Sequence, residues 1–296
     1  MAEKDIAEKT LEAYNDVFAD IINVLLFNGK TLVKEDELEE ESPNSSYKAD
    51  NKLHAQERDI AKYWRKGLVR IAFYGIENQT SVDADMPLRL FGYDGAAYRS
   101  QLLKKDQDES ITDEKIPRFP VITLVLYFGY DQRWKTPRTL YDCLNIPKEL
   151  LPYVNDYKMN LFEIAYLSDE QVQMFQSDFR IVADYFIQMR KNREYKAPAT
   201  TITHVHELLQ LMSVMTKDSR FEDAYNQEME GGNVSMCEVL DRVEKKGFNE
   251  GQFKGRGEVA ALVQFLIDHD RQDDLKKLSD ADYRDKLIDE LLLNNH

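Results

Sequence analysis

The sequence predicts a mixed α/β domain that reaches to about residue 195 and is followed by a helical region. Two runs rich in β-forming residues surround a basic turn within residues 60–76, and residues 121–127 are almost wholly apolar. After residue 198 the strand pattern disappears. We therefore expect two domains, residues 1–195 and residues 196–296.

The first half of the α/β domain contains a helix, a polar loop and a hairpin. From Leu11 onward, apolar residues recur at intervals of three and four, which predicts a helix that ends near Asn28-Gly29. Residues 35–41 hold six acids in seven positions and lead into Ser-Pro-Asn-Ser-Ser, which indicates a solvated loop. Residues 60–64 and 68–76 flank Arg65-Lys66-Gly67 and predict a β-hairpin.

The remaining elements follow from the same periodicities. We expect a helix over residues 86–103, a strand covered on both faces over 121–127, a strand over 159–166 and a helix over 169–191. In the helical region, the sequence pattern predicts short helices over residues 205–215, 221–230, 236–246, 259–268 and 281–293. Its glycines at 247, 251 and 255 align on one helical face and predict self-association, with a flexible linker as the alternative.

Composition restricts the class of protein. The 296 residues are 43% apolar and 31% charged, so a packed core is expected. With 39 basic and 54 acidic residues the formal charge is −15, which repels nucleic acid unless cations gather locally. Apolar runs are too short for a bilayer and the N-terminal residues are too acidic for a secretory signal, so we expect a cytoplasmic protein without a membrane partner. Cys143 and Cys237 lack zinc-site spacing and indicate free thiols.

Carboxylates at the ends of the hairpin strands suggest a metal site. Glu77 and Gln79 share a strand face, and Asp59 begins the preceding strand at the same end of the hairpin. Hydrolysis of a phosphodiester uses a divalent cation such as Mg²⁺, which carboxylates hold. Asp59 and Glu77 are the candidate metal ligands with the carbonyl of Asn78, and the amide of Gln79 is suited to hold the attacking water.

The spacing of these residues resembles the PD-(D/E)XK nuclease pattern. The surrounding sequence resembles the Rpn family of recombination-promoting nucleases and putative transposases. The likeness covers residues 14 to about 195. It rests on Tyr14-Asn15-Asp16-Val17-Phe18, Gln56-Glu57-Arg58-Asp59, Gly75-Ile76-Glu77-Asn78-Gln79-Thr80, Asp85-Met86-Pro87-Leu88-Arg89, Gly92-Tyr93 and Val125-Leu126-Tyr127-Phe128-Gly129. The resemblance implies a PD-(D/E)XK-like mixed sheet flanked by helices.

Several site residues have structural alternatives. Gln79 stands where the superfamily usually has Lys, and it carries no charge to stabilise a developing anion. Lys62 lies three residues from Asp59 and faces the other side of the strand, so we assign it no catalytic role. Without the resemblance, we would interpret Asp59 as a strand-edge or turn residue. Asp16 belongs to the first block of the resemblance and is suited to add a carboxylate to the site, but the helical wheel puts Asp16 and Asp20 opposite the apolar stripe, which favours a solvated face. We expect Asn23 to bond a loop backbone and His204 and His206 to open a helix.

Two groups of basic residues are candidates for phosphate contacts. Residues 60–76 contain no acid, and Trp134 has three basic neighbours in the loop after the apolar strand. The candidate nucleic-acid contacts are Lys62, Arg65, Lys66, Arg70, Arg89 and Tyr93, with Arg133, Lys135 and Arg138 as a second path. Arg89 and Tyr93 lie one helical turn apart and either face the cleft or pack. The alternative for the hairpin cations is pairing with the abundant acids.

The function expected from the resemblance is metal-dependent endonucleolytic cleavage of DNA in recombination or transposition, with Asp59, Glu77 and Gln79 as catalytic residues. The first alternative is a catalytically weak or inactive nucleic-acid-binding or assembly protein that keeps the fold. A second alternative is a protein-interaction module in which the acidic helical tail dominates. The expected partners are Mg²⁺ or another divalent cation, DNA and a second copy of the chain bound through the C-terminal helices.

Overall fold

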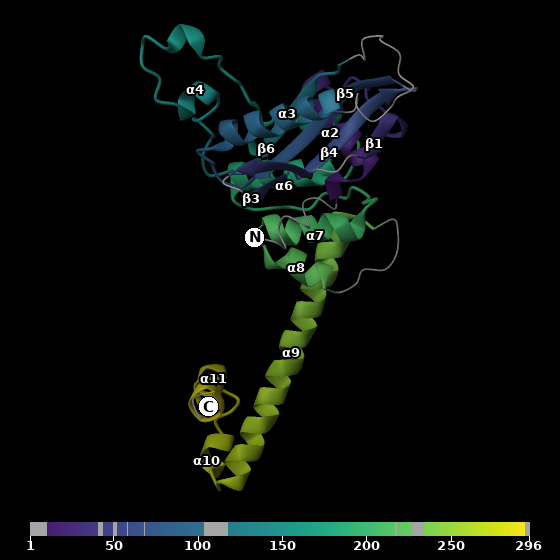
Figure 1. Ribbon diagram of the computed structural model, residues 1–296. Coiled ribbons are helices and arrows are strands. Elements are labelled where there is room, and N and C mark those ends of the chain that lie inside the picture. Colours follow the sequence, from purple (N-terminus) through teal and green to yellow (C-terminus); the bar gives the residue numbers. More distant parts are fainter. Residues whose placement is uncertain are drawn as a thin grey trace. The chain divides into compact units, whose positions relative to one another are not determined.

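Five strands form a mixed sheet in the computed structural model, which describes residues 11–40, 44–49, 52–57, 59–67, 69–103, 118–216, 218–226 and 234–293. The order across the sheet is β1-β4-β5-β6-β7, and the first four of these strands are labelled in Figure 1. The strands are β1 (Leu38–Glu40), β4 (Ile60–Lys66), β5 (Val69–Gln79), β6 (Val121–Tyr127) and β7 (Asn160–Glu163). The predicted α/β class is therefore confirmed for this part of the chain.

The predicted hairpin is present as β4 and β5. The two strands pair in antiparallel register with Ile60 opposite Ile76, and Gly67 turns the chain with a φ of 61°, a backbone angle that glycine adopts without a Cβ clash. Next to the hairpin, β5 and β6 run parallel, and so do β6 and β7. Parallel strands end at one edge of the sheet, so Gln79, Tyr127 and Glu163 lie side by side there.

Helices cover both faces of the sheet. On one face lie α2 (Asn15–Phe27) and α6 (Phe179–Asn192); the rings of Phe179 and Phe186 on α6 contact Phe128 at the end of β6. The other face carries α3 (Met86–Leu103) (Figure 1). Met86 and Leu90 of α3 belong to a core cluster with Val125 and Tyr127 of β6. This two-sided burial explains the apolar character of 121–127.

The acidic segment after α2 differs from the prediction of a solvated loop. It contains a 3₁₀ turn (Glu35–Glu37) and strand β1, which pairs antiparallel with β4. Beyond it, β2 (Asn44–Ala49) and β3 (Lys52–Glu57) form a two-stranded antiparallel ribbon. The segment is ordered because its acids meet the cations of the hairpin, a long-range pairing that the local pattern does not record.

Between β6 and β7 the chain includes α4 (Leu140–Cys143) and a 3₁₀ turn (Leu151–Tyr153), and β7 passes into another 3₁₀ turn (Ile164–Tyr166). The helix expected over 169–191 is two helices, α5 (Asp169–Met174) and α6. It is interrupted because the backbone N–H groups of Gln176 and Ser177 donate to the carboxylate of Asp20 on α2, at 2.9 and 2.8 Å.

Helices α7 (Val205–Met215) and α8 (Ser219–Tyr225) belong to the same compact unit as the sheet. Contacts divide the chain into Met1–Cys237 and Glu238–His296, whereas the sequence indicated a boundary near residue 195. The two helices remain with the sheet because long-range bonds anchor them. Nε2 of His204 lies 3.0 Å from the carboxylate of Asp16, and Tyr14 donates to Glu207 on α7 at 2.9 Å.

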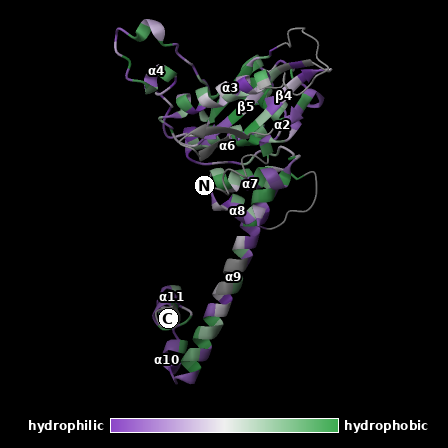
Figure 2. Ribbon diagram, viewed as in Figure 1, coloured by the Kyte–Doolittle hydropathy of each residue, from purple (hydrophilic) through white to green (hydrophobic). Residues whose placement is uncertain are grey.

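The C-terminal unit is helical, as predicted, but the helices expected over residues 236–246 and 259–268 are one continuous helix. They form α9 (Met236–Asp268), which is followed by α10 (Gln272–Leu275), α11 (Ala281–Ile288) and a π-helical turn (Asp289–Leu293). Leu262 and Leu266 pack with Leu287 and Ile288 in a small core. Hydrophobic and hydrophilic residues alternate along α9 (Figure 2), and no helix among the described residues has the length and apolarity needed to cross a bilayer.

Candidate functional site

The end of β5 presents its polar residues to both faces of the sheet. Glu77 points toward α3, its side chain is 1% exposed, and Oε2 lies 3.3 Å from a guanidinium nitrogen of Arg89. Asn78 points to the opposite face, where its amide donates to Oε2 of Glu12 at 2.6 Å. The alternation of a strand therefore separates Glu77 from the side chain of Asn78 and leaves Gln79 on the face of Glu77.

Asp59 meets the same end of β5 from the adjacent strand. It precedes Ile60, which pairs with Ile76, and its Oδ2 accepts a hydrogen bond from the backbone N–H of Asn78 at 2.7 Å. Burial raises the pKa of the Tyr93 hydroxyl, and the negative charges of Glu77 and Asp59 raise it further. Continuing the antiparallel register beyond Ile60 and Ile76 sets Asp59 opposite Glu77, so the two predicted ligands lie side by side.

Arg89 and Tyr93 lie beside Asp59 and Glu77, and we call these four residues the carboxylate group of the site. The two residues are therefore not a separate surface for nucleic acid. The guanidinium of Arg89 contacts Asp83 at 2.7 Å and the Tyr93 hydroxyl at 3.2 Å, in addition to Glu77. Burial alone would lower the pKa of Arg89, but its bonds with Asp83 and Tyr93 and the charge of Glu77 raise it. Tyr93 is buried, so its predicted role in contacting nucleic acid is replaced by packing beside Glu77.

Glu12 is a site neighbour that the sequence analysis missed. Its side chain is fully buried and contacts Asn78, a residue 66 positions later in the chain. Asn78 is therefore held through its side chain by Glu12 and through its backbone by Asp59. No local pattern marks a buried glutamate at the start of an apolar stripe, because its partner comes from a distant strand.

The predicted basic patch on the hairpin is largely covered by acids of β1 and the turn before it. Arg65 and Arg70 both pair with Glu39, at 3.2 and 3.3 Å. Lys62 is 2% exposed, donates to Asn15 at 2.7 Å and lies 3.6 Å from Glu40. Its ammonium is thus enclosed on the α2 face, and we correct its expected role from phosphate contact to structural pairing. Lys66 lies over the ring of Trp64 at 5.2 Å.

The second basic group surrounds a buried tryptophan. Trp134 is fully buried and donates through its indole N–H to the carbonyl of Pro137 at 2.7 Å. Around it, Arg133 and Arg138 pair with Glu163 at 3.6 and 3.4 Å. The tryptophan thus serves the core, while the cations remain at the sheet edge.

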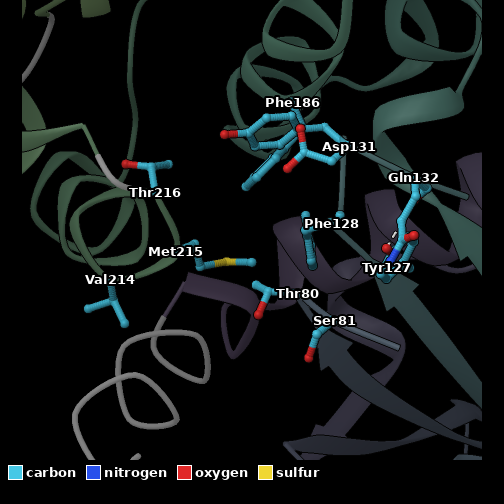
Figure 3. Close-up of a pocket in the computed structure, with 12 residues that line it drawn as sticks. Thr80, Ser81, Tyr127, Phe128, Asp131, Gln132, Phe186, Val214, Met215 and Thr216 are labelled. Carbon is cyan, nitrogen blue, oxygen red and sulfur yellow. Dashed lines mark hydrogen bonds between the residues drawn. The ribbon is translucent and has the colours of Figure 1, made fainter. Parts of the chain in front are cut away.

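A pocket of about 410 Å³ lies beyond the ends of β5 and β6. Figure 3 shows Thr80 and Ser81 on one side and Asp131 on the other, with Phe128 and Met215 between them. Thr80 and Ser81 follow Gln79 directly in the chain. The walls of the pocket combine apolar rings with hydroxyl and carboxylate groups.

The donor set of the carboxylate group suits a hard cation that keeps most of its own water. Among the described residues, no cluster of three or more His, Cys, Asp and Glu side chains can enclose a metal ion. Mg²⁺ needs one or two carboxylates and takes its other ligands from water and substrate phosphates. Asp59 and Glu77 meet that smaller requirement.

Comparison with protein families gives a match over the region that contains this group. The family described as putative transposase, YhgA-like, matches residues 65–220, which is more than half of the chain. The chain belongs to this family. The membership confirms the resemblance to putative transposases that the sequence analysis noted. No curated protein and no solved structure shows a significant match.

The matched region of this YhgA-like chain contains most of the candidate site. It begins at the end of β4 and extends into α8, so it includes Glu77, Asn78, Gln79 and Arg89. Asp59 precedes the matched region and is joined to it by the hydrogen bond to Asn78. The matched region also contains α7, in agreement with the contacts that group this helix with the sheet.

Proposed function

We propose that this YhgA-like protein is a metal-dependent DNA endonuclease of the PD-(D/E)XK type that acts in recombination or transposition. The observation that carries the proposal is the meeting of Asp59 and Glu77 at the end of adjacent strands, with Asn78 bonded to Asp59 at 2.7 Å. Membership of a putative transposase family supports DNA as the substrate class.

In this proposal Asp59 and Glu77 hold the cation together with the carbonyl of Asn78. A bound Mg²⁺ supplies neutralisation of the scissile phosphate and activation of water. The chain provides fixed ligands: the N–H of Asn78 orients the Asp59 carboxylate, and Arg89 orients Glu77. Gln79 shares the face of Glu77 and positions the attacking water through its amide.

The runner-up function is nucleic-acid binding or assembly with a weak or inactive site. Two features favour it. Gln79 replaces the usual lysine of the superfamily, and Arg89 already neutralises part of the charge of Glu77 at 3.3 Å. Both reduce the electrostatic attraction for a metal and for a developing anion.

Nicking of supercoiled plasmid by the purified full chain separates the two functions. We expect conversion to open-circular DNA with Mg²⁺, no conversion with EDTA, and loss of conversion in Asp59→Ala. DNA binding without metal-dependent nicking would replace the proposal by the runner-up.

A further inference from the structure

Cations and tyrosines form one connected surface at the edge where β6 and β7 end. The guanidinium groups of Arg133 and Arg190 lie 4.5 and 5.0 Å from the ring centre of Tyr166. Tyr166 donates to the carbonyl of Tyr130 at 3.4 Å. Arg193 lies 5.5 Å from the Tyr130 ring and pairs with Asp131. The edge cluster consists of Arg133, Lys135, Arg138, Arg190, Arg193, Tyr130 and Tyr166.

The edge cluster lies close to the proposed catalytic group. Gln79 is in register with Tyr127, and Tyr127 with Glu163, so the three side chains share a face of the sheet. Two strand spacings of about 4.8 Å separate Gln79 from Glu163. Because Arg133 and Arg138 contact Glu163, their charges begin about 10 Å from Gln79, within the reach of neighbouring phosphates on one strand.

Charge balance favours this edge over the hairpin. Among the residues that the structure describes, the five cations of the edge cluster form ion pairs with two acids, Glu163 and Asp131. On the hairpin, the acidic segment supplies Glu39 and Glu40 to the cations, and Glu37 binds Trp64 at 2.9 Å.

Exposure favours the same edge. The side chains of Arg133 and Arg193 are 59% and 58% exposed, against 32% and 28% for Arg65 and Arg70. A polyanion therefore meets more positive charge, and more accessible charge, at the edge cluster than at the hairpin.

We propose that the DNA backbone crosses the edge where β5, β6 and β7 end, and that the edge cluster holds the phosphates next to the cleaved bond. The inference rests on the proposed function and specifies the substrate path at the same site. The pocket lined by Thr80, Ser81 and Tyr130 lies at the same edge of the sheet. Phosphate contacts there release counterions, so binding weakens steeply with salt.

Two charge-matched variants of the full chain test the path. The edge variant carries Arg133→Gln, Lys135→Gln and Arg193→Gln; Arg138 is kept because it bonds the loop carbonyls of Trp134 and Lys135. The hairpin variant carries Arg65→Gln, Lys66→Gln and Arg70→Gln. Both lose three positive charges, so long-range repulsion changes equally and a difference between them reports local contact.

Fluorescence anisotropy with a labelled DNA duplex, at several salt concentrations and without metal, gives the readout. For the edge variant we expect affinity to fall by about tenfold or more and the slope of log K against log salt to decrease by roughly 2 to 3. The hairpin variant should keep its affinity within about threefold of the wild type, and its salt slope should stay close to the wild-type slope. A Lys-substituted edge variant, Arg133→Lys with Arg193→Lys, should bind close to wild type.

The outcomes distinguish this inference from the function on which it rests. Equal losses in the two Gln variants, or a larger loss in the hairpin variant, would overturn the edge path while leaving DNA binding in place. Absence of DNA binding by the wild type would instead overturn the proposed function. Circular dichroism and thermal unfolding confirm that each variant is folded. If the triple edge variant is unfolded, Arg193→Gln alone, compared with Arg70→Gln alone, takes its place, and an equal or larger loss of affinity in Arg70→Gln would overturn the edge path.

Discussion

The carboxylate of Asp59 accepts a hydrogen bond from the backbone N–H of Asn78 at 2.7 Å. This bond joins the residue before β4 to the end of β5, where Glu77 and Gln79 lie. On the opposite face, Glu12 holds the side chain of Asn78 at 2.6 Å. The segment that carries the candidate ligands is thus fixed by the protein itself, as a preorganised site requires.

Loss of either carboxylate should abolish nicking. In Asp59→Ala and Glu77→Ala we expect no Mg²⁺-dependent cleavage, because each change removes a ligand and the charge that attracts the cation. Gln79→Ala should be milder, since it leaves both carboxylates in place. Gln79→Lys introduces the residue that the PD-(D/E)XK pattern usually has at this place and should retain or raise activity. Plasmid nicking at equal protein concentration measures the order.

The nicking series needs folded proteins and an EDTA control, because a trace of contaminating nuclease imitates weak activity. DNA affinity should be close to wild type in all four variants. Full Mg²⁺-dependent cleavage by a folded Glu77→Ala protein would falsify the assignment of this carboxylate.

Lys62 should affect stability and not DNA binding. Its side chain is enclosed by Asn15, Glu40 and the ring of Phe18, so Lys62→Ala loses packing and should lower the free energy of unfolding by about 2 to 3 kcal/mol. Lys62→Met keeps most of the volume and should stay within about 1 kcal/mol of wild type. Urea unfolding checks both, and reduced DNA affinity in a stably folded Met variant would contradict the structural role.

The same lysine gives a pH dependence. Burial lowers the pKa of Lys62 in the folded protein, although Glu40 opposes this effect. Between that lowered pKa and the unfolded value of about 10.4, the unfolded chain binds more protons, so stability rises with pH. Relative to Lys62→Met, the wild type should therefore gain stability as the pH increases toward about 10. A constant difference between the two proteins would contradict this effect.

Asn23 should be important for stability because it bonds a loop backbone, as the sequence suggested. Its amide donates to the carbonyl of Val33 at 2.7 Å, and its Oδ1 accepts from the N–H groups of Leu32 and Val33. Asn23→Ala leaves these groups without that partner and should cost about 2 to 3 kcal/mol in urea unfolding. Asn28→Gly is the control: Asn28 ends α2 with a φ of 52°, which glycine accepts, so little change is expected.

Self-association through the glycine row of α9 stays a prediction. Cβ atoms added at Gly247 and Gly255 would meet nothing within 4 Å among the described residues, so a second helix has room to approach. Leu262 and Leu266, which follow the glycines on α9, pack within the chain. We expect the full chain to sediment as an oligomer and a chain ending at Lys246 as a monomer. Gly255→Leu should weaken association, and identical monomeric behaviour of all three would exclude it.

Local patterns in the sequence determined the elements around the site. The β-rich runs around Gly67 predicted the hairpin, and the two-residue period placed Glu77 and Gln79 on one face. Strand and helix periods are properties of the backbone, so the direction of a side chain follows from its position within an element. For this reason the sequence also placed Lys62 on the side away from Asp59.

Only the tertiary structure decided which charges meet. In the sequence, Glu39, Glu40 and the cations of the hairpin are each consistent with solvent exposure or with pairing. The position of β1 beside β4 selects pairing. Glu12 accepts a hydrogen bond from Asn78, which lies 66 positions later in the chain, and the carboxylate of Asp16 contacts His204, which lies 188 positions later. A charged residue carries no local record of its partner, because Coulombic attraction depends on distance in space, which packing of the whole chain sets.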